Sequence, residues 1–207
     1  MEITQPLEGI PIWTFSGLDI PSFPKVISSN RAGYADDVPE LQDVKYEKRQ
    51  IVDMKTNSEN KKYLLDVLNK IEKAISIIKA QDHCDVIRKI LMEDWYGTEW
   101  KFDLKDMYKE VIIDLQGYNM GWHLDNRKTK SNIICNLEDN ESSTEFLILA
   151  APNPKNIDTF MPSKILWKAP TKKGWGYFWF NHHTLWHKIE IKEKSRKIIK
   201  LSNVSCA

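Results

Sequence analysis

The spacing of apolar residues changes near residue 109, and this change predicts two kinds of structure. Between residues 59 and 80, apolar side chains recur every three or four positions, which is typical of an amphipathic helix with Ser58 as its expected N-cap. The apolar positions are Leu64, Val67, Leu68, Ile71, Ile75 and Ile78. A second helix is predicted over residues 85 to 92, from the spacing of Val86, Ile87, Ile90 and Leu91.

After residue 109, short runs rich in Val, Ile, Phe, Trp and Tyr follow one another, separated by turn residues. We expect strands at residues 110–118, 131–137, 144–150, 164–168, 175–180, 187–191 and 196–202. Successive short strands without helices between them indicate an antiparallel sandwich or barrel. The predicted fold class is therefore α+β and mainly β, with supporting helices followed by a β-barrel or jelly roll.

The 207 residues suffice for one sizeable core, and the sequence shows no internal repeat and no convincing linker. We therefore expect a single domain over residues 1–207. Residues 1–45, rich in Pro, Gly and Ser, are predicted to form an irregular arm, and residues 48–55 could be a first strand. Residues 1–108 would thus hold the arm, the helices and this strand, and residues 109–207 the β core.

Composition narrows the function classes. Lys and Arg number 30 and Asp and Glu 29, so the net charge of +1 gives no overall attraction to nucleic acid or anionic membrane. The longest apolar run, residues 146–151, is far shorter than the roughly 20 residues of a membrane span. Three cysteines without a CxxC pair, and no signal-peptide pattern at the N-terminus, favour a reducing, cytoplasmic location.

Aromatic residues are frequent, with 8 Trp, 7 Tyr and 7 Phe. Large aromatic side chains most often fill a core, but they can also line a ligand cleft or stack on a sugar. Both interpretations stay open at this point.

The segment GYNMGWHLDN, residues 117–126, contains the candidate chemistry. In an extended segment, side chains two residues apart point the same way, so His123 and Asp125 can converge on one point. His187 begins a second apolar row with Ile189 and Ile191, and this row is expected to face inward. By contrast, His182 and His183 lie in a turn and are expected to face solvent.

Two histidines and one carboxylate on one face of a metal leave open coordination positions, as in non-haem Fe(II) oxygenases. Zinc accepts the same ligands. The ordinary alternatives are polar loop residues for His123 and Asp125 and a core histidine for His187. Arg196 opens the last predicted strand, and a buried arginine there would need an anionic partner such as a carboxylate. The ordinary interpretation of Arg196 is an exposed surface charge among the neighbouring lysines.

Together these residues resemble the pattern of the 2-oxoglutarate and Fe(II)-dependent dioxygenases of the prolyl hydroxylase-like type. In that family an HxD motif is followed by a distal His and then, about ten residues later, by Arg or Lys; here these are His123, Asp125, His187 and Arg196. A Y-x-x-G motif at residues 118–121 and the stretch KKGWGYFWFN before the distal histidine also match. The resemblance covers residues 110 to 202, although Lys194 and Ile198 stand where many members have Gly and Ser.

The resemblance implies a double-stranded β-helix in which His123, Asp125 and His187 bind Fe(II). It implies 2-oxoglutarate as cosubstrate, with its far carboxylate on Arg196, or on Lys197 as a fallback, and Tyr118 as a further cosubstrate contact. The implied reaction consumes O2, releases succinate and CO2, and hydroxylates a C–H bond.

The primary substrate stays open among a peptide side chain, a nucleotide and a small metabolite. Arg127, Lys128 and Lys130 could form a rim for an anionic substrate or simply a solvated loop. Two alternative functions are a cupin-like metalloenzyme that does not use 2-oxoglutarate and a Trp-rich β-sandwich that binds carbohydrate. The sequence does not indicate the oligomeric state.

Overall fold

A computed structural model describes residues 1–7, 12–25, 29–31, 48–54, 57–79, 107–125, 129–148, 167–181 and 185–204. Several predicted features lie outside these residues: the helix at 85–92, Arg127, Lys128, His182, His183 and the side chain of Lys130. Within the described part, no helix is both long enough and apolar enough to cross a membrane.

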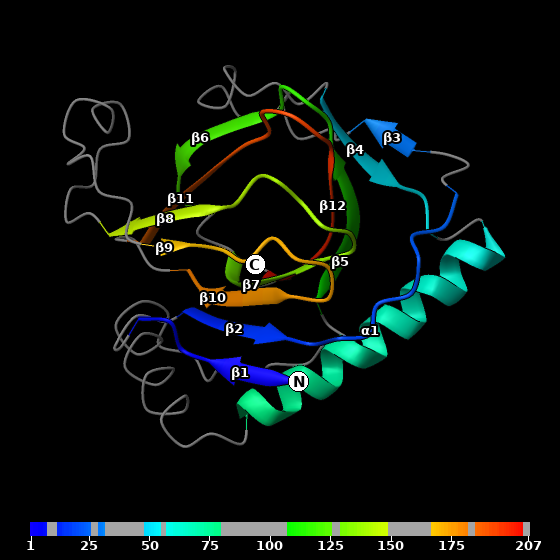
Figure 1. Cartoon of the computed structure of the whole chain (residues 1–207), viewed down its shortest axis with the longest axis horizontal. Helices are drawn as coiled ribbons and strands as arrows, with labels where there is room; N and C mark the ends of the chain where they lie inside the picture. Colours follow the sequence, from blue (N-terminus) through cyan, green and yellow to red (C-terminus); the bar gives the residue numbers. More distant parts are fainter. Residues whose placement is uncertain are drawn as a thin grey trace.

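The described chain forms two antiparallel sheets (Figure 1). The larger sheet has the order β1-β2-β10-β7-β12-β5-β4-β3, and the smaller has the order β6-β11-β8-β9. The strands of the larger sheet are β1 (Glu2–Thr4), β2 (Ile12–Ser16), β3 (Ser29–Arg31), β4 (Arg49–Val52), β5 (Tyr108–Asp114), β7 (Thr129–Asn136), β10 (Gly176–Phe180) and β12 (Arg196–Val204). Those of the smaller sheet are β6 (Asn119–His123), β8 (Glu145–Ile148), β9 (Trp167–Lys168) and β11 (Leu185–Glu190).

The predicted first helix is confirmed as α1, Ser58–Lys79, which lies along one side of the larger sheet (Figure 1). Its buried residues Val67, Ile71 and Ala74 join a core cluster with Trp13, Phe178 and other residues on that face of the sheet. The prediction of Ser58 as N-cap is wrong. The side-chain oxygen of Asn57 accepts hydrogen bonds from the amides of Glu59 and Asn60, at 2.9 and 3.1 Å, so Asn57 is the cap.

The opposite face of the larger sheet packs against the smaller sheet. Successive side chains of a strand point to opposite faces, so β12 sends Ile199 and Leu201 to the α1 side and Ile198 to the other. A second core cluster joins the two sheets and consists of Ile12, Ile112, Ile134, Phe146, Ala169, Tyr177, Trp179, Leu185 and Ile198. The molecule is therefore layered as helix, larger sheet and smaller sheet.

The strands predicted after residue 109 are confirmed within the described residues, with shifted ends, whereas β6 was not predicted. Residues 149–150 and 164–166 of two predicted strands lie outside the described part. One predicted strand, 110–118, is too long at its C-terminal end, because Gly117 has a φ of 83° and turns the chain between β5 and β6. The prediction of an irregular arm at residues 1–45 is wrong for three segments, since β1, β2 and β3 belong to the larger sheet. These strands have three to five residues, which is too short for a clear period.

The tryptophans of the described core favour the packing interpretation. Trp13, Trp179 and Trp186 are buried, whereas Trp175 is 38% exposed. A flat, exposed row of indoles, as a sugar-stacking surface requires, is absent from the part of the chain that the structure describes.

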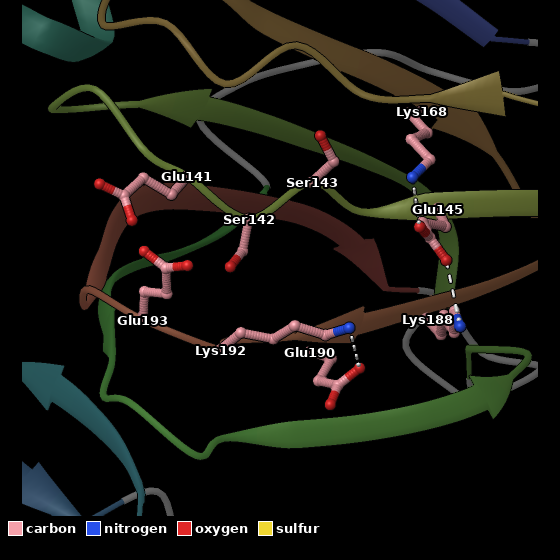
Figure 2. Close-up of a pocket in the computed structure, with 9 residues that line it drawn as sticks. All are labelled: Glu141, Ser142, Ser143, Glu145, Lys168, Lys188, Glu190, Lys192 and Glu193. Carbon is pink, nitrogen blue, oxygen red and sulfur yellow. Dashed lines mark ion pairs between the residues drawn. The ribbon is translucent and has the colours of Figure 1, made fainter.

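A surface pocket of about 420 Å³ lies on the outer face of the smaller sheet (Figure 2). It is lined by Glu141, Ser142, Ser143, Glu145, Lys168, Lys188, Glu190, Lys192 and Glu193. Its charges largely pair with one another, since Glu145 lies 3.0 Å from Lys168 and 3.1 Å from Lys188. On β11, Lys188 and Glu190 face this pocket, so His187, one position away, points to the opposite side.

Candidate metal centre

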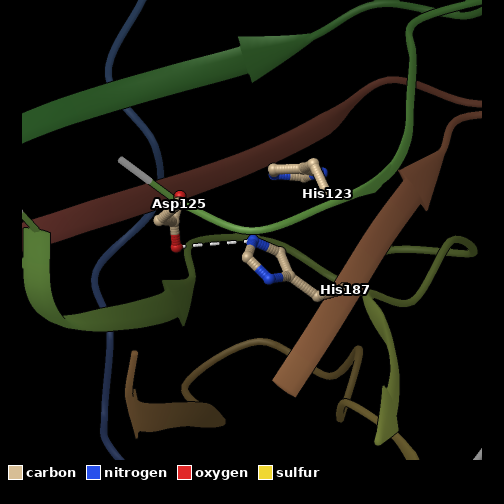
Figure 3. Close-up of side chains that lie close together, drawn as sticks. All are labelled: His123, Asp125 and His187. Carbon is tan, nitrogen blue, oxygen red and sulfur yellow. Dashed lines mark ion pairs between the residues drawn. The ribbon is translucent and has the colours of Figure 1, made fainter. Parts of the chain in front are cut away.

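The three predicted metal ligands come together in space (Figure 3). His123 is the last residue of β6, and His187 lies directly opposite it on β11. Asp125 follows two residues after His123, and its Oδ2 is 3.4 Å from Nε2 of His187. One ligating atom from each of the three residues lies within 4.8 Å of the others. The strand pairing is irregular between His187 and Ile189, and such irregularities re-aim side chains at strand ends.

The hydrogen bonds leave ring nitrogens available for a metal. Nδ1 of His123 lies 2.7 Å from the carbonyl oxygen of Gly121. A carbonyl only accepts, so this Nδ1 carries the proton and Nε2 keeps its lone pair. Nδ1 of His187 is buried and has no hydrogen-bond partner among the described residues, so the ring of His187 is held by packing and by its contact with Asp125.

The surroundings keep all three groups in their ligating forms. Burial lowers the pKa of His187 to about 3, with a further lowering by His123. Burial also lowers the pKa of His123. For Asp125, burial alone would raise the pKa, but the charge of Lys200 and the hydrogen bond from Asn132 bring it below the usual value. Near neutral pH the site therefore presents two neutral imidazoles and one carboxylate, the protonation states that metal binding requires.

A second layer of polar residues holds Asp125. The side-chain amide of Asn132 donates to Oδ2 of Asp125 at 2.8 Å, and Ser202 donates to Asn132 Oδ1 at 2.7 Å. Nζ of Lys200 lies 3.8 Å from Oδ1 of Asp125. Sequence reasoning missed these three residues. The available signal was strand alternation, which places Lys200 and Ser202 on the face of β12 that also carries Arg196.

Aromatic rings surround His187. Its ring stacks on Phe146 with centroids 5.7 Å apart and meets Trp179 edge-on at 5.3 Å. These rings limit the access of water, which explains why His187 is so strongly biased toward its neutral form.

Arg196 is 3% exposed and is held by several hydrogen bonds. Its Nε and Nη2 donate to Oδ2 of Asp114 at 3.1 and 2.6 Å, and its Nη1 donates to Thr144 Oγ1 at 3.1 Å. Arg49 donates to the same carboxylate, from Nε to Oδ1 at 2.6 Å and from Nη2 to Oδ2 at 3.1 Å. Asp114 is thus the anionic partner that a buried Arg196 needs, and sequence reasoning did not find it.

The end of Arg196 that faces away from Asp114 meets hydroxyl groups instead of a second carboxylate. Thr144 Oγ1, the partner of Nη1, lies 2.6 Å from the hydroxyl of Tyr177. Burial raises the pKa of Tyr177, so its phenol is neutral at ordinary pH. The guanidinium of Arg196 is therefore bonded to one carboxylate and one neutral hydroxyl.

The two other predicted cosubstrate residues lie apart from this position. Lys197 points to the opposite face of β12, where its Nζ bonds both oxygens of Glu138, at 2.9 and 2.8 Å. Lys197 therefore does not share the face of Arg196. Tyr118 is buried, and its ring lies under the guanidinium of Arg49, 4.3 Å from the centroid. Tyr118 contacts Arg49, which shares Asp114 with Arg196.

The metal centre and Arg196 lie along the same face of β12. Arg196 and Lys200 are four residues apart on this strand, a separation of about 13 Å at the usual rise of a strand. Lys200 reaches the triad through Asp125, and the buried Ile198 lies between the two positions.

No protein-family model and no curated protein matches this sequence. Similar solved structures include a prolyl hydroxylase from Trichoplax adhaerens in complex with a hypoxia inducible factor peptide fragment, at 11% identity and a TM-score of 0.47. The match covers 75% of this chain and 62% of that one, so this chain spans less than two thirds of its length.

Two further similar structures are also prolyl hydroxylases. The prolyl-4-hydroxylase from Pseudomonas putida has 13% identity, coverage of 86% of this chain and 78% of that chain, and a TM-score of 0.44. The viral collagen prolyl hydroxylase from Paramecium Bursaria Chlorella virus-1, in a 2OG complex, has 13% identity, coverage of 77% and 79%, and a TM-score of 0.39. Because every one of these scores is below 0.5, the function proposed below rests on the residues of the site.

Proposed function

We propose that this chain is a non-haem Fe(II) and 2-oxoglutarate-dependent oxygenase that hydroxylates a C–H bond. The observation that carries the proposal is the convergence of His123, Asp125 and His187 within 4.8 Å. Two histidines and one carboxylate on one face of a metal are the ligand set of non-haem Fe(II) oxygenases. The candidate primary substrates are a peptide side chain, a nucleotide and a small metabolite.

The strand order supports a jelly roll of the double-stranded β-helix type over residues 109–207. Of the last eight strands, β5, β12, β7 and β10 lie in that order in the larger sheet, and β6, β11, β8 and β9 in the smaller. Successive strands from β5 to β8 thus alternate between the two sheets, as they do in a jelly roll. In this arrangement β6 and β11 are paired neighbours, and His123 of β6 lies opposite His187 of β11.

The residues present fit a divalent iron. The donors are two neutral imidazoles and a carboxylate, and Asn132 fixes the carboxylate in the way that outer hydrogen bonds fix metal ligands. When bound, Fe(II) with 2-oxoglutarate and O2 would supply the oxidising chemistry: substrate C–H, O2 and 2-oxoglutarate give C–OH, succinate and CO2. A reducing cytoplasm would keep the iron ferrous.

The chain's own residues would bind and orient the cosubstrate. Nη1 of Arg196, with the hydroxyls of Thr144 and Tyr177, would hold the far carboxylate, while Asp114 fixes the guanidinium. Tyr118 would act through Arg49, on which it packs. Phe146 and Trp179 would exclude water around His187, which protects the reaction from side reactions with solvent.

The proposal is tested by adding Fe(II) and then 2-oxoglutarate to metal-free protein without oxygen and recording the visible spectrum. We expect a weak charge-transfer band that needs both additions and is lost in His187→Ala. Arg196→Ala should weaken 2-oxoglutarate binding while leaving metal binding intact, because Arg196 lies about 13 Å along β12 from Lys200. Lys197→Ala is the matched control. It should change neither 2-oxoglutarate binding nor metal binding, because Lys197 lies on the opposite face of β12 from Arg196.

Other outcomes identify the alternatives. If the folded protein binds metal but gives no charge-transfer band with 2-oxoglutarate, and Arg196→Ala does not change the spectrum, the protein would be a cupin-like metalloenzyme that does not use 2-oxoglutarate. A folded protein that binds no metal would be a binding module, although the buried Trp13, Trp179 and Trp186 do not favour one that stacks on sugars.

A further inference from the structure

We infer that Lys200 takes the place of the metal's charge beside Asp125 in the metal-free protein and must move away when the metal binds. The inference rests on the proposed metal centre. Nζ of Lys200 lies 3.8 Å from Oδ1 of Asp125, on the face of β12 that borders the triad. Lys200 is therefore a residue that tunes metal affinity through Asp125.

The two oxygens of Asp125 have different partners. Oδ2 faces Nε2 of His187 at 3.4 Å and accepts the hydrogen bond from Asn132. Oδ1 faces Lys200, the only Lys or Arg paired with Asp125 among the described residues. Asn132 thus fixes the position of the carboxylate, and Lys200 supplies a counter-charge.

A divalent cation at the triad would replace that counter-charge. With the metal in place, the ammonium group and the ion would lie on the same carboxylate and repel each other, most strongly where water is partly excluded. The side chain of Asp125 is only 12% exposed, so screening there is limited. Displacing Lys200 would therefore make metal binding less favourable than it would be without this charge.

The side chain of Lys200 can move away from Asp125. Its side chain is 25% exposed, so its flexible stem can carry the ammonium group toward solvent. Glu110 lies directly opposite Lys200 on β5, and residues opposite each other on one face of a sheet are within side-chain reach. Displacement from Asp125 therefore leaves the lysine near water and near a second carboxylate.

The test is the affinity of the metal-free, full-length protein for Mn(II) alone, measured by calorimetry at pH 7.5. Lys200→Met keeps the length of the side chain and removes its charge. We expect Kd for Mn(II) to become about tenfold smaller, or about 1.4 kcal/mol, and the rise in Tm on adding Mn(II) to become larger. Lys200→Gln, a second neutral variant, should change Kd in the same direction.

Three controls separate charge competition from a general change in the site. Lys200→Arg keeps the charge and should keep the wild-type Kd. Lys197→Met, a change on the other face of β12, should also leave Kd unchanged. Asn132→Ala removes the hydrogen bond to the same carboxylate and should weaken Mn(II) binding tenfold or more, opposite in sign to Lys200→Met.

The outcomes distinguish this inference from the proposed function. If the wild type binds Mn(II) and both neutral Lys200 variants bind it equally or more weakly, the role of Lys200 is wrong and the metal centre stands. If the folded wild type binds neither Mn(II) nor Fe(II), the metal centre and the role of Lys200 are both wrong.

Discussion

At the scale of single residues, burial decides the chemistry of this site. His187 and Asp114 are almost inaccessible to water, and each is held in one charge state by its neighbours. His187 is kept neutral by burial, and Asp114 is kept ionised by Arg49 and Arg196 although burial opposes it. Each charge state has a measurable consequence for stability.

Acidification should destabilise the metal-free protein through His187. Its pKa is about 3 when folded and about 6.5 when unfolded, so between these values the unfolded chain binds a proton that the folded protein does not. The stabilisation is complete above pH 6.5 and is lost as pH falls toward 3. Urea unfolding should show a loss of roughly 1.4 kcal/mol per pH unit from this group.

The variant His187→Gln isolates this contribution. Its unfolding free energy should depend less on pH between 6.5 and 4 than that of the wild type, because glutamine does not titrate. An unchanged slope would mean that His187 is protonated in the folded protein.

Removal of the Asp114 charge should destabilise the protein strongly. Asp114→Asn keeps the shape of the side chain but leaves Arg49 and Arg196, both buried, without their shared carboxylate. We expect a loss of about 3–5 kcal/mol in urea unfolding at pH 7. The control is Asp66→Asn, in a half-exposed pair with Lys70 on α1, which should cost under about 1 kcal/mol. Similar losses in both variants would contradict the buried role of Asp114.

At the scale of elements, β12 carries both Arg196 and the residues that contact Asp125 and Asn132. Arg196, Lys200 and Ser202 share one face, whereas Lys197, Ile199 and Leu201 share the other. A shift of one residue in the pairing of β12 with β5 and β7 would exchange these faces. The buried Ile199 and Leu201, packed on the α1 side, oppose such a shift and thereby fix the direction of Arg196.

The start of α1 gives a prediction at the same scale. Asn57→Ala removes the side-chain oxygen that caps the amides of Glu59 and Asn60. The unfolding free energy should fall by about 1 kcal/mol. The neighbouring Ser58→Ala should be nearly silent, because Ser58 is the first helical residue. If Ser58→Ala lowered the unfolding free energy more than Asn57→Ala, Ser58 and not Asn57 would be the N-cap.

At the scale of the whole molecule, the N-terminal strands β1 to β4 extend both edges of the larger sheet. On one side β2 pairs with β10, and on the other β4 pairs with β5 (Figure 1). Trp13 and Phe15 of β2 also belong to the core under α1. These contacts tie the N-terminal strands to the strands that carry the site.

We therefore predict that residues 1–207 unfold as a single domain in one cooperative transition. Tryptophan fluorescence and far-ultraviolet circular dichroism should give the same midpoint in urea. The variant Trp13→Phe, which removes a reporter from β2, should retain a single coincident transition. Two separated transitions would show that the N-terminal strands and the β core are independent units.

The sequence alone determined the features that depend on near neighbours along the chain. The 3.6-residue period located α1, and runs of β-branched and aromatic residues located the described strands after residue 109 except β6. The two-residue spacing of His123 and Asp125 indicated that they converge, and the inward row of β11 selected His187. Such patterns are local, since they follow from the geometry of one helix or one strand.

Tertiary structure alone decided the partners of those residues. Asp114 and Arg196 are 82 positions apart, and Asn132 and Ser202 are 70 apart. These pairs exist because the register of β12 with β5 and β7 places them side by side, and register depends on the packing of both sheet faces at once. The short strands β1, β2 and β3 likewise form because a sheet edge is present to pair with them, which their own sequences do not reveal.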